Sequence, residues 1–236
     1  MLTEQRYAKI LELLEAQKSI TVTEVRELLD ISESTVRRDI VALHKAGKLT
    51  KVFGGAVALE NTVIHEEPTV AQKKDVQVAE KKEIAARAAD LITDEDFIYL
   101  DAGTTTGYMI EHLSGRRITV MTNAVDHAKR LADAGLKVCL VGGELKSSTE
   151  AIIGSQAVEM LKNYHFTKGF FGTNGVTKKA GYTTPDINEA LVKKTAMGQC
   201  QECFVLADDT KFDKISSVTF APYTAAKLIT NEKAPQ

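Results

Sequence analysis

Residues 31–40 read ISESTVRRDI and residues 53–56 read FGGA, and these two stretches decide the fold of the N-terminal part of the chain. Serine is a favoured helix N-cap, so we expect a helix that begins after Ser32. Glycine is favoured just past a helix end, so we expect this helix to end near Gly47. Its expected inner face consists of Val36, Ile40 and Leu43. Its expected outer face consists of Ser34, Arg37, Arg38, Val41 and Lys45.

Two more helices and a pair of strands complete the expected N-terminal domain. The first helix follows Thr3, a capping residue type, because apolar residues then recur at helical spacing: Tyr7, Ile10, Leu11 and Leu14. The second is expected to be capped by Thr23 and to run to Leu29. The residues that it would bury are Val25, Leu28 and Leu29. Residues 49–53 and 56–58 are expected to be short strands around Gly54-Gly55, which makes a helix-turn-helix with a β-wing.

The charge of this region favours a DNA contact. Residues 1–60 carry nine Lys/Arg and nine Asp/Glu, whereas residues 33–55 carry a net charge of +3. Small hydroxyl residues let a helix N-terminus approach phosphates, and arginine can pair with guanine in the major groove. On charge alone, a solvated helix face is the alternative. The expected DNA-binding residues are Ser32, Ser34, Thr35, Arg37, Arg38, Lys48 and Lys51.

In order and spacing, residues 31–40 followed by Phe53-Gly54-Gly55-Ala56 resemble the N-terminal domain of DeoR-type bacterial transcriptional repressors. Lys51 departs from the family pattern, which mostly has arginine there. Lysine keeps the charge but lacks the bidentate fork, so base reading is not expected of Lys51.

The rest of the chain is expected to be a linker followed by an α/β domain. Residues 59–79 contain one proline, mixed charge and little periodicity, and helix resumes at Glu80 with Ile84, Ala85, Ala88, Leu91 and Ile92 on one side. Strand and helix patterns then alternate, which is typical of a mostly parallel sheet. The predicted strands are 97–101, 118–122, 137–141, 168–172, 203–207, 218–220 and 227–230. The expected domains are thus a winged helix-turn-helix (1–58), a linker (59–79) and an α/β domain (80–236).

Small polar residues follow several of these strands, where parallel sheets bind their ligands. The Gly103-Thr104-Thr105-Thr106 loop between a strand and a helix is a candidate phosphate site, with ordinary helix capping as the alternative. Lys211 adds a positive charge suited to a phosphate or a sugar oxygen. The expected effector-binding residues are Asp101, Thr104, Thr105, Thr106, Asn123, Gly142, Gly143, Asn174, Glu189, Asp208 and Lys211.

This half resembles the DeoR family's C-terminal sensor domain, with matches at residues 101–105, 122–123, 142–143, 172–175, 207–208 and 211–212. The resemblance implies a fold similar to ribose-5-phosphate isomerase and an ability to sense phosphorylated sugars. Residues 181–186 with Glu189-Ala190 look most like repressors of fructose phosphotransferase operons, which implies fructose 1-phosphate. Glycerol 3-phosphate, tagatose 6-phosphate and other sugar phosphates remain open. The family usually continues beyond the position of Gln236, so a truncated last sheet edge is expected.

The expected function is a repressor of a sugar-utilisation operon, derepressed by a phosphorylated sugar. Its expected partners are a double-stranded DNA operator, the effector and further copies of itself, as a dimer or tetramer. The alternative is a sugar-phosphate isomerase-like enzyme fused to a DNA-binding domain. That enzyme would need a carboxylate base, and residues 172–176 (GTNGV) contain no carboxylate. Glu189 is more readily a hydroxyl acceptor or a surface charge than a base, so no catalytic residue is expected.

Composition excludes several other classes. With 44% hydrophobic and 26% charged residues, the chain is an ordinary globular sequence, and its net charge of −2 does not fit a structural nucleoid protein. No apolar run approaches the ~20 residues of a membrane helix, and no basic-then-apolar leader begins the chain. A cytoplasmic location, associated with the nucleoid when bound to the operator, is therefore expected. Cys200 and Cys203 are expected to be buried thiols, and the five scattered histidines predict no metal site and no cofactor.

Overall fold

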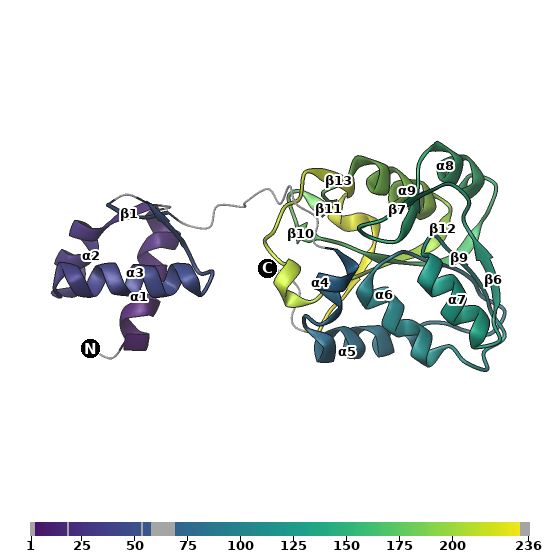
Figure 1. The fold of residues 1–236 in the computed structure, drawn as a ribbon, viewed down its shortest axis with the longest axis horizontal. Helices are drawn as coiled ribbons and strands as arrows, with labels where there is room; N and C mark the ends of the chain where they lie inside the picture. The colour runs from purple at the N-terminus through teal and green to yellow at the C-terminus, as the bar shows by residue number, and fades with distance from the viewer. Residues whose placement is uncertain (1–2, 18, 53, 58–68, 232–236) are drawn as a thin grey trace. The chain divides into compact units, whose positions relative to one another are not determined.

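The computed structural model describes residues 3–17, 19–52, 54–57 and 69–231 (Figure 1). The chain divides into two compact units, which comprise Met1–Thr62 and Val63–Gln236. No helix of the described residues is long and apolar enough to cross a membrane.

The N-terminal unit is a winged helix-turn-helix, as predicted. Its helices are α1 (Thr3–Gln17), α2 (Val22–Leu29) and α3 (Glu33–Lys45). Its strands β1 (Ser19–Thr21), β2 (Thr50–Val52) and β3 (Gly55–Val57) form an antiparallel sheet in the order β1-β3-β2. One hydrophobic core joins the helices to the sheet, and the inner face predicted for α3 is part of it: Val36, Ile40 and Leu43.

Two details of the second helix were predicted wrongly. Its N-cap is Thr21, because Thr21 ends strand β1 in an extended conformation and its hydroxyl accepts a hydrogen bond from the Glu24 amide. The Glu24 carboxylate accepts from the Thr21 amide in return, at 2.6 Å, which completes a capping box that Thr23 could not form. Leu28 is not buried but 58% exposed, because it lies about 100° around α2 from Leu29, beyond the edge of the face formed by Val22, Val25 and Leu29.

Strand β1 was not predicted, and it explains Gly55 in the wing. Ile20 of β1 lies directly opposite Ala56 of β3. A Cβ atom on Gly55 would lie 2.0 Å from the Ile20 carbonyl oxygen, so only glycine allows the two strands to pair this closely. Phe53 and Ala58, which were predicted in the two wing strands, lie outside the described residues.

A six-stranded parallel sheet forms the centre of the C-terminal unit. Its order is β14-β12-β9-β4-β5-β6. The strands are β4 (Phe97–Leu100), β5 (Thr119–Thr122), β6 (Lys137–Leu140), β9 (Phe166–Gly172), β12 (Cys200–Leu206) and β14 (Lys227–Ile229). Along the chain, β5 and β6 are added on one side of β4. Strands β9, β12 and β14 are then added on its other side. The carboxyl ends of β4 and β9 therefore form the point at which open α/β sheets bind ligands.

Helices cover both faces of this sheet (Figure 1). One face packs against α5 (Val78–Ala89), α6 (Thr104–Tyr108), the 3-10 helix η1 (Met109–His112) and α7 (Val125–Asp133). The other face packs against α8 (Ser155–Leu161) and α9 (Ile187–Gly198). Neighbouring residues alternate between the two cores: Phe170 belongs to the first and Phe171 to the second.

Short antiparallel strands surround the sheet's ligand-binding edge, and only one of them, expected at 218–220, was predicted. A hairpin of β7 (Glu144–Lys146) and β8 (Ala151–Ile153) precedes α8. A second small sheet has the order β10-β11-β13, from β10 (Gly175–Thr177), β11 (Gly181–Thr184) and β13 (Val218–Ala221). The 3-10 helices η2 (Asp209–Lys211) and η3 (Tyr223–Ala225) connect the last strands.

The segment 59–79, expected as a linker, is only partly described. Residues 58–68 lie outside the described residues. Residues 70–74 form α4 (Val70–Lys74), and α5 begins at Val78. The Val70 amide donates a hydrogen bond of 3.1 Å to the Ser148 carbonyl, so α4 is attached to the C-terminal unit. Leu91, expected on the inner side of the helix from Glu80, lies beyond the end of α5 and is 40% exposed.

Candidate functional site

The N-terminus of α3 carries a compact group of three hydroxyls. Ser32 caps the helix, and its Oγ accepts a hydrogen bond from the Thr35 amide at 3.3 Å. The same Oγ lies 2.9 Å from Ser34 Oγ and 2.9 Å from Thr35 Oγ1. Ser32 and Ser34 are exposed and Thr35 is half-buried, so this helix end presents short polar groups to solvent.

The two arginines of α3 differ in their surroundings. Arg37 forms an ion pair with Glu33 one turn earlier, with 2.5 Å between Nη2 and Oε1 and 3.0 Å between Nε and Oε1. Arg38 is exposed, and no hydrogen bond or ion pair of its guanidinium is found within the described part of the chain. Arg38 therefore offers an uncompensated charge beside Arg37.

An ion pair between the partly buried Arg6 and the buried Asp39 attaches α3 to α1. Arg6 donates from Nε to Asp39 Oδ2 at 2.7 Å and from Nη2 to Asp39 Oδ1 at 3.1 Å. Asp39 is 4% exposed and follows Arg38 directly in the chain. The forked contact fixes the rotation of α3 and so holds Arg37 and Arg38 on the outer side.

The wing lysines predicted to touch DNA are both exposed. Lys48 follows α3, and its amide donates to the Leu43 carbonyl at 2.9 Å. Lys51 is the middle residue of β2, the strand that leads to the turn at Gly54. The structure places all seven predicted DNA-binding residues on α3, its N-cap or the wing, with none of them buried.

The C-terminal unit contains a polar pocket at the carboxyl ends of β4, β9 and β12. The carboxyl ends of β4 and β9 are where an open α/β sheet of this order is expected to bind its ligand. Charged side chains reach it from several elements. Those that line it are Lys73, Lys81, Asp101, Glu189, Lys193, Asp208 and Lys211. Neutral residues complete the lining: Val70, Ala102, Gly103, Thr104, Thr105, Asn123, Thr149, Ala151, Gly172, Thr173, Asn174, Leu206 and Ala207.

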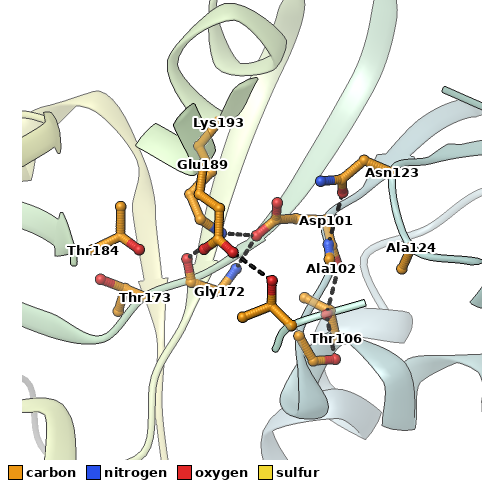
Figure 2. Close-up of polar contacts among 12 residues, drawn as sticks. Asp101, Ala102, Thr106, Asn123, Ala124, Gly172, Thr173, Thr184, Glu189 and Lys193 are labelled. Carbon is orange, nitrogen blue, oxygen red and sulfur yellow. Dashed lines mark hydrogen bonds and ion pairs between the residues drawn. The ribbon is translucent and has the colours of Figure 1, made fainter. Parts of the chain in front are cut away.

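Asp101 lines the pocket, and its contacts with neighbouring residues are drawn in Figure 2. One carboxylate oxygen, Oδ2, forms an ion pair with Lys193 and accepts a hydrogen bond from the Gly172 amide at 3.0 Å. Burial raises the pKa of Asp101, although Lys193 and the Gly172 amide both favour the charged form. The other oxygen, Oδ1, is buried with no hydrogen-bond partner among the described residues.

Glu189 lies close to this pair and is itself 7% exposed. Its Oε1 accepts from the Thr149 hydroxyl at 2.5 Å and lies 3.1 Å from Lys146 Nζ. Burial alone would raise the pKa of Glu189, but Lys193, Thr149 and Lys146 together hold it below its ordinary value. Glu189 is therefore an ionised hydrogen-bond acceptor at neutral pH.

A cluster of lysines lies on the side of the pocket formed by α4, α5 and η2. Lys81 is 3% exposed, and its Nζ donates to the Lys73 carbonyl at 2.6 Å. Burial lowers the pKa of Lys81, Lys211 and Lys73 lower it further, and Asp208 opposes them. Lys211 Nζ lies 3.9 Å from Asp208 Oδ2. Within the described residues, no carboxylate lies within ion-pair distance of Lys81.

Both units match one protein family. Residues 6–62 match the DeoR-like helix-turn-helix domain, and residues 76–232 match the DeoR C terminal sensor domain. The chain belongs to the DeoR family. It is therefore a DNA-binding transcriptional repressor of that family, as the order of its motifs predicted.

The sequence of this DeoR-family protein is similar to that of other regulators over nearly its whole length. It is 41% identical over 233 residues to FruR, an uncharacterized HTH-type transcriptional regulator of Bacillus subtilis (strain 168), across 98% of this chain and 92% of that protein. It is 35% identical over 219 residues to the lactose phosphotransferase system repressor of Staphylococcus aureus (strain N315), across 92% and 86%.

Solved structures show more distant likenesses. The full-length sorbitol operon regulator SorC from Klebsiella pneumoniae is 12% identical with a TM-score of 0.46, across 95% of both chains. Ribose 5-phosphate isomerase A from Methanocaldococcus jannaschii is 16% identical with a TM-score of 0.43, across 56% of this chain and 53% of that one.

Eight of the eleven predicted effector residues line the pocket of this DeoR-family sensor domain: Asp101, Thr104, Thr105, Asn123, Asn174, Glu189, Asp208 and Lys211. The structure places the other three elsewhere. Thr106 is fully buried and donates its hydroxyl to the carbonyls of Asp101 and Gly103. Gly142 donates its amide to Met160 Sδ, and a Cβ on Gly143 would lie 2.6 Å from the Ile153 carbonyl oxygen. These three support the loops around the pocket.

Asn123 and Asp208 also have structural contacts. The Asn123 side chain accepts from the Ala102 amide at 2.9 Å and donates to the Ile152 carbonyl at 3.2 Å, which ties the end of β5 to the loop after β4 and to β8. Asp208 caps η2 by accepting from the Thr210 amide at 3.1 Å. Both residues shape the pocket, and their pocket-facing atoms remain candidates for ligand contact.

Sequence reasoning missed three charged residues of the pocket, Lys73, Lys81 and Lys193. Lys81 and Lys193 each lie in the apolar stripe of their helix: Lys81 lies three residues before Ile84, and Lys193 lies three residues after Ala190. A lysine in such a stripe is costly to bury without a function, so this was the available signal. No cluster of three metal-ligating side chains is found among the described residues.

Proposed function

We propose that this DeoR-family protein represses a sugar-utilisation operon linked to a phosphotransferase system, with fructose as the sugar, and that a phosphorylated sugar derepresses it. The preferred effector is fructose 1-phosphate. The pocket of the C-terminal unit binds the effector, and the α3 face with the wing binds the operator.

The observation that carries this proposal is the buried ammonium of Lys81. It lies in a pocket, is 3% exposed and has no carboxylate within ion-pair distance in the described part of the chain. A buried charge without a partner is unfavourable unless a ligand supplies the opposite charge. Asp208, Lys211 and Lys73 all lie close enough to Lys81 to affect its pKa, and the three lysines together outnumber the one carboxylate, so this group suits an anion such as a phosphate ester.

Two carboxylates of the pocket suit sugar hydroxyls. Asp101 and Glu189 are buried carboxylates, and Asp101 Oδ1 has no partner among the described residues. Carboxylate oxygens accept hydrogen bonds from hydroxyl groups. The pocket thus offers both ammonium groups, from Lys73, Lys81 and Lys211, and carboxylate oxygens, from Asp101 and Glu189, and this combination fits a molecule with a phosphate and several hydroxyls.

Relatives support the choice of sugar class. FruR and the lactose phosphotransferase system repressor both align with almost the full chain. The lactose repressor is named for a phosphotransferase system. This chain is 41% identical to FruR. Fructose 1-phosphate therefore leads the effector candidates, ahead of glycerol 3-phosphate and tagatose 6-phosphate.

The proposed mechanism is allosteric. An oligomer, a dimer or tetramer, places two winged helices on operator half-sites about 34 Å apart or a multiple of that distance. The effector then favours an arrangement of the DNA-binding domains that does not fit the operator. Its effect on operator affinity is limited to the coupling free energy between the two sites, typically about 1–3 kcal/mol.

Fluorescence anisotropy tests the proposal on labelled DNA from upstream of the gene and its neighbours, with and without each of the three sugar phosphates. We expect tight operator binding that one sugar phosphate releases and that unphosphorylated fructose does not. Tight binding that no sugar phosphate alters would contradict the effector assignment while leaving the DNA-binding assignment in place.

We also infer that the pocket binds its ligand without turnover. Glu189 is the carboxylate that the sequence offered as a candidate general base. Its Oε1 already accepts a hydrogen bond from Thr149 and pairs with Lys146. A ribose-5-phosphate isomerase assay on the purified protein checks this. Activity that survives repurification and disappears in Glu189→Gln would establish the enzyme alternative.

A further inference from the structure

Helix α4 forms one wall of the ligand pocket. Val70 and Lys73 line this pocket, and Ala71 and Lys74 line a second cavity that adjoins it. α4 is also the first described helix of the C-terminal unit, and residues 58–68 separate Thr69 from the end of β3. The helix that covers the pocket is thus the part of the sensor domain nearest in sequence to the DNA-binding domain.

α4 is held by polar contacts rather than by a hydrophobic face. None of its five residues is buried. The Val70 amide donates to the Ser148 carbonyl at 3.1 Å, and the Tyr108 hydroxyl lies 3.4 Å from the Lys74 carbonyl. A further contact comes from the pocket itself, where Lys81 Nζ donates to the Lys73 carbonyl at 2.6 Å. Elements with few buried apolar contacts open at low free energy.

A strained residue lies between α4 and α5. Gln77 has φ 53° and ψ 45°, a left-handed conformation that residues other than glycine rarely adopt. Its side-chain amide lies 3.4 Å from Asp209 Oδ1, next to the pocket residue Asp208. Because left-handed backbone is held in place only by its surroundings, Gln77 is a natural pivot for α4.

We propose that α4 is a ligand-responsive helix that couples the pocket to the DNA-binding domain; this rests on the proposed function of the pocket. A sugar phosphate contacts Lys73 and Val70 only while α4 occupies its observed position, so the ligand stabilises that position. Lys81 strengthens the effect, because an ammonium has three protons and can hold both the Lys73 carbonyl and a phosphate oxygen.

Release of α4 changes the length of chain between the two domains. With α4 in place, eleven residues (58–68) lie between β3 and Thr69. With α4 released as far as Gln77, nineteen residues (58–76) lie between β3 and the pivot. At up to about 3.4 Å per residue, the added chain extends the reach by as much as about 27 Å. This is comparable to the ~34 Å between adjacent half-sites, so ligand binding would restrict how far the DNA-binding domains can separate.

The N-cap of α4 provides a matched pair of variants. Thr69 does not line the pocket, and it forms a capping box with Gln72, with 3.3 Å between the Gln72 amide and Thr69 Oγ1. Thr69→Ala removes the cap and should raise the effector concentration for half-release of the operator about fivefold. Thr69→Ser keeps the cap and should behave as the wild type. Without effector, operator affinity should be unchanged in Thr69→Ser and equal to or tighter than that of the wild type in Thr69→Ala, because loss of the cap favours the released position of α4.

Hydrogen exchange of the full-length protein reads the position of α4 directly. On addition of fructose 1-phosphate, amides of residues 70–77 should exchange at least tenfold more slowly, because their opening requires release of the ligand. The Thr69→Ala variant should show faster exchange in this segment without ligand, and partial recovery with it.

The outcomes separate this inference from the proposed function. If fructose 1-phosphate binds and releases the operator while exchange of 70–77 is unchanged, the coupling role of α4 is wrong and the effector assignment stands. Equal effector sensitivity of Thr69→Ala and wild type leads to the same conclusion. If none of the three sugar phosphates binds in calorimetry, the proposed function and the inference about α4 are both overturned.

Discussion

Lys193 extends from the middle of α9 to the carboxyl end of β4, where it pairs with Asp101 in the floor of the pocket; the exposed fractions of the two side chains are 7% and 1%. Both charges are thus removed from water. Breaking such a pair by removing one partner costs about 3–5 kcal/mol, because the remaining charge is left buried.

The first prediction concerns this pair. Lys193→Met should lower the free energy of unfolding of the C-terminal unit by about 3 kcal/mol, because Asp101 would keep only the Gly172 amide as a partner. Asp101→Asn in the Lys193→Met background should recover part of the loss, since it removes the unpaired charge. Urea denaturation of the four proteins of this cycle measures the coupling. Strictly additive effects would show that the two side chains do not interact.

The second prediction concerns the recognition helix. Arg38→Ala and Arg37→Ala should each weaken operator binding by about 1–3 kcal/mol, which is the usual value of an arginine–guanine contact. Effector binding in calorimetry should be unchanged, because both residues lie in the other unit. Lys162→Ala, an exposed residue after α8, is the control. Repression at the wild-type level by both arginine variants would show that α3 does not read the operator.

The third prediction concerns the lysine side of the pocket. Lys211→Ala should leave operator binding intact and make release by the sugar phosphate at least tenfold less sensitive, because a charge-assisted contact is lost. Lys81→Met should have a larger effect, since its ammonium is the more deeply buried. Lys178→Ala, exposed in the turn between β10 and β11, serves as the control. Normal induction in Lys211→Ala would remove this residue from the ligand site.

The fourth prediction concerns acid stability. Burial alone would raise the pKa of Asp96, but Lys168 at 2.5 Å and the Thr93 amide at 2.8 Å hold it at about 2, below the ordinary 3.8. Because the pKa is lower in the folded state, the contribution of Asp96 to stability is complete above about pH 4 and lost as the pH falls to 2. The stability difference between the wild type and Asp96→Asn should therefore shrink over this range. Urea midpoints at pH 2, 3, 4 and 7 measure it, and a difference that stays constant with pH would contradict the assignment.

Much of the N-terminal domain could be predicted because its signals are local. The cap at Ser32, the inner face of α3 and the glycines of the wing lie within about 25 residues and obey short-range rules. Strand β1 could not be predicted in the same way, because three residues become a strand only by pairing with β3 about 35 positions later. The Thr21 cap follows from that strand, so the error at Thr23 has the same origin.

The pocket was predictable in position but not in full composition. Polar residues such as Asp101 and Asp208 follow strands, and the carboxyl ends of parallel strands meet at one edge. Lys81 and Lys193 reach that edge from helices, and their contribution depends on which face of each helix meets the sheet. α4 lies in a stretch of little periodicity, and its position depends on contacts with Ser148 and Lys81 that sequence spacing does not reveal.

The contact between Glu33 and Arg37 has a consequence for the search for the operator. Affinity for arbitrary DNA depends on how many phosphate counterions a basic surface displaces into the solvent. An arginine that already has a carboxylate beside it displaces fewer of them, so Glu33 weakens the attraction to every sequence alike. A guanine edge can still accept the two hydrogen bonds that a guanidinium offers. The pair thus raises the ratio of operator binding to background binding, which governs occupancy when one site competes with a whole chromosome.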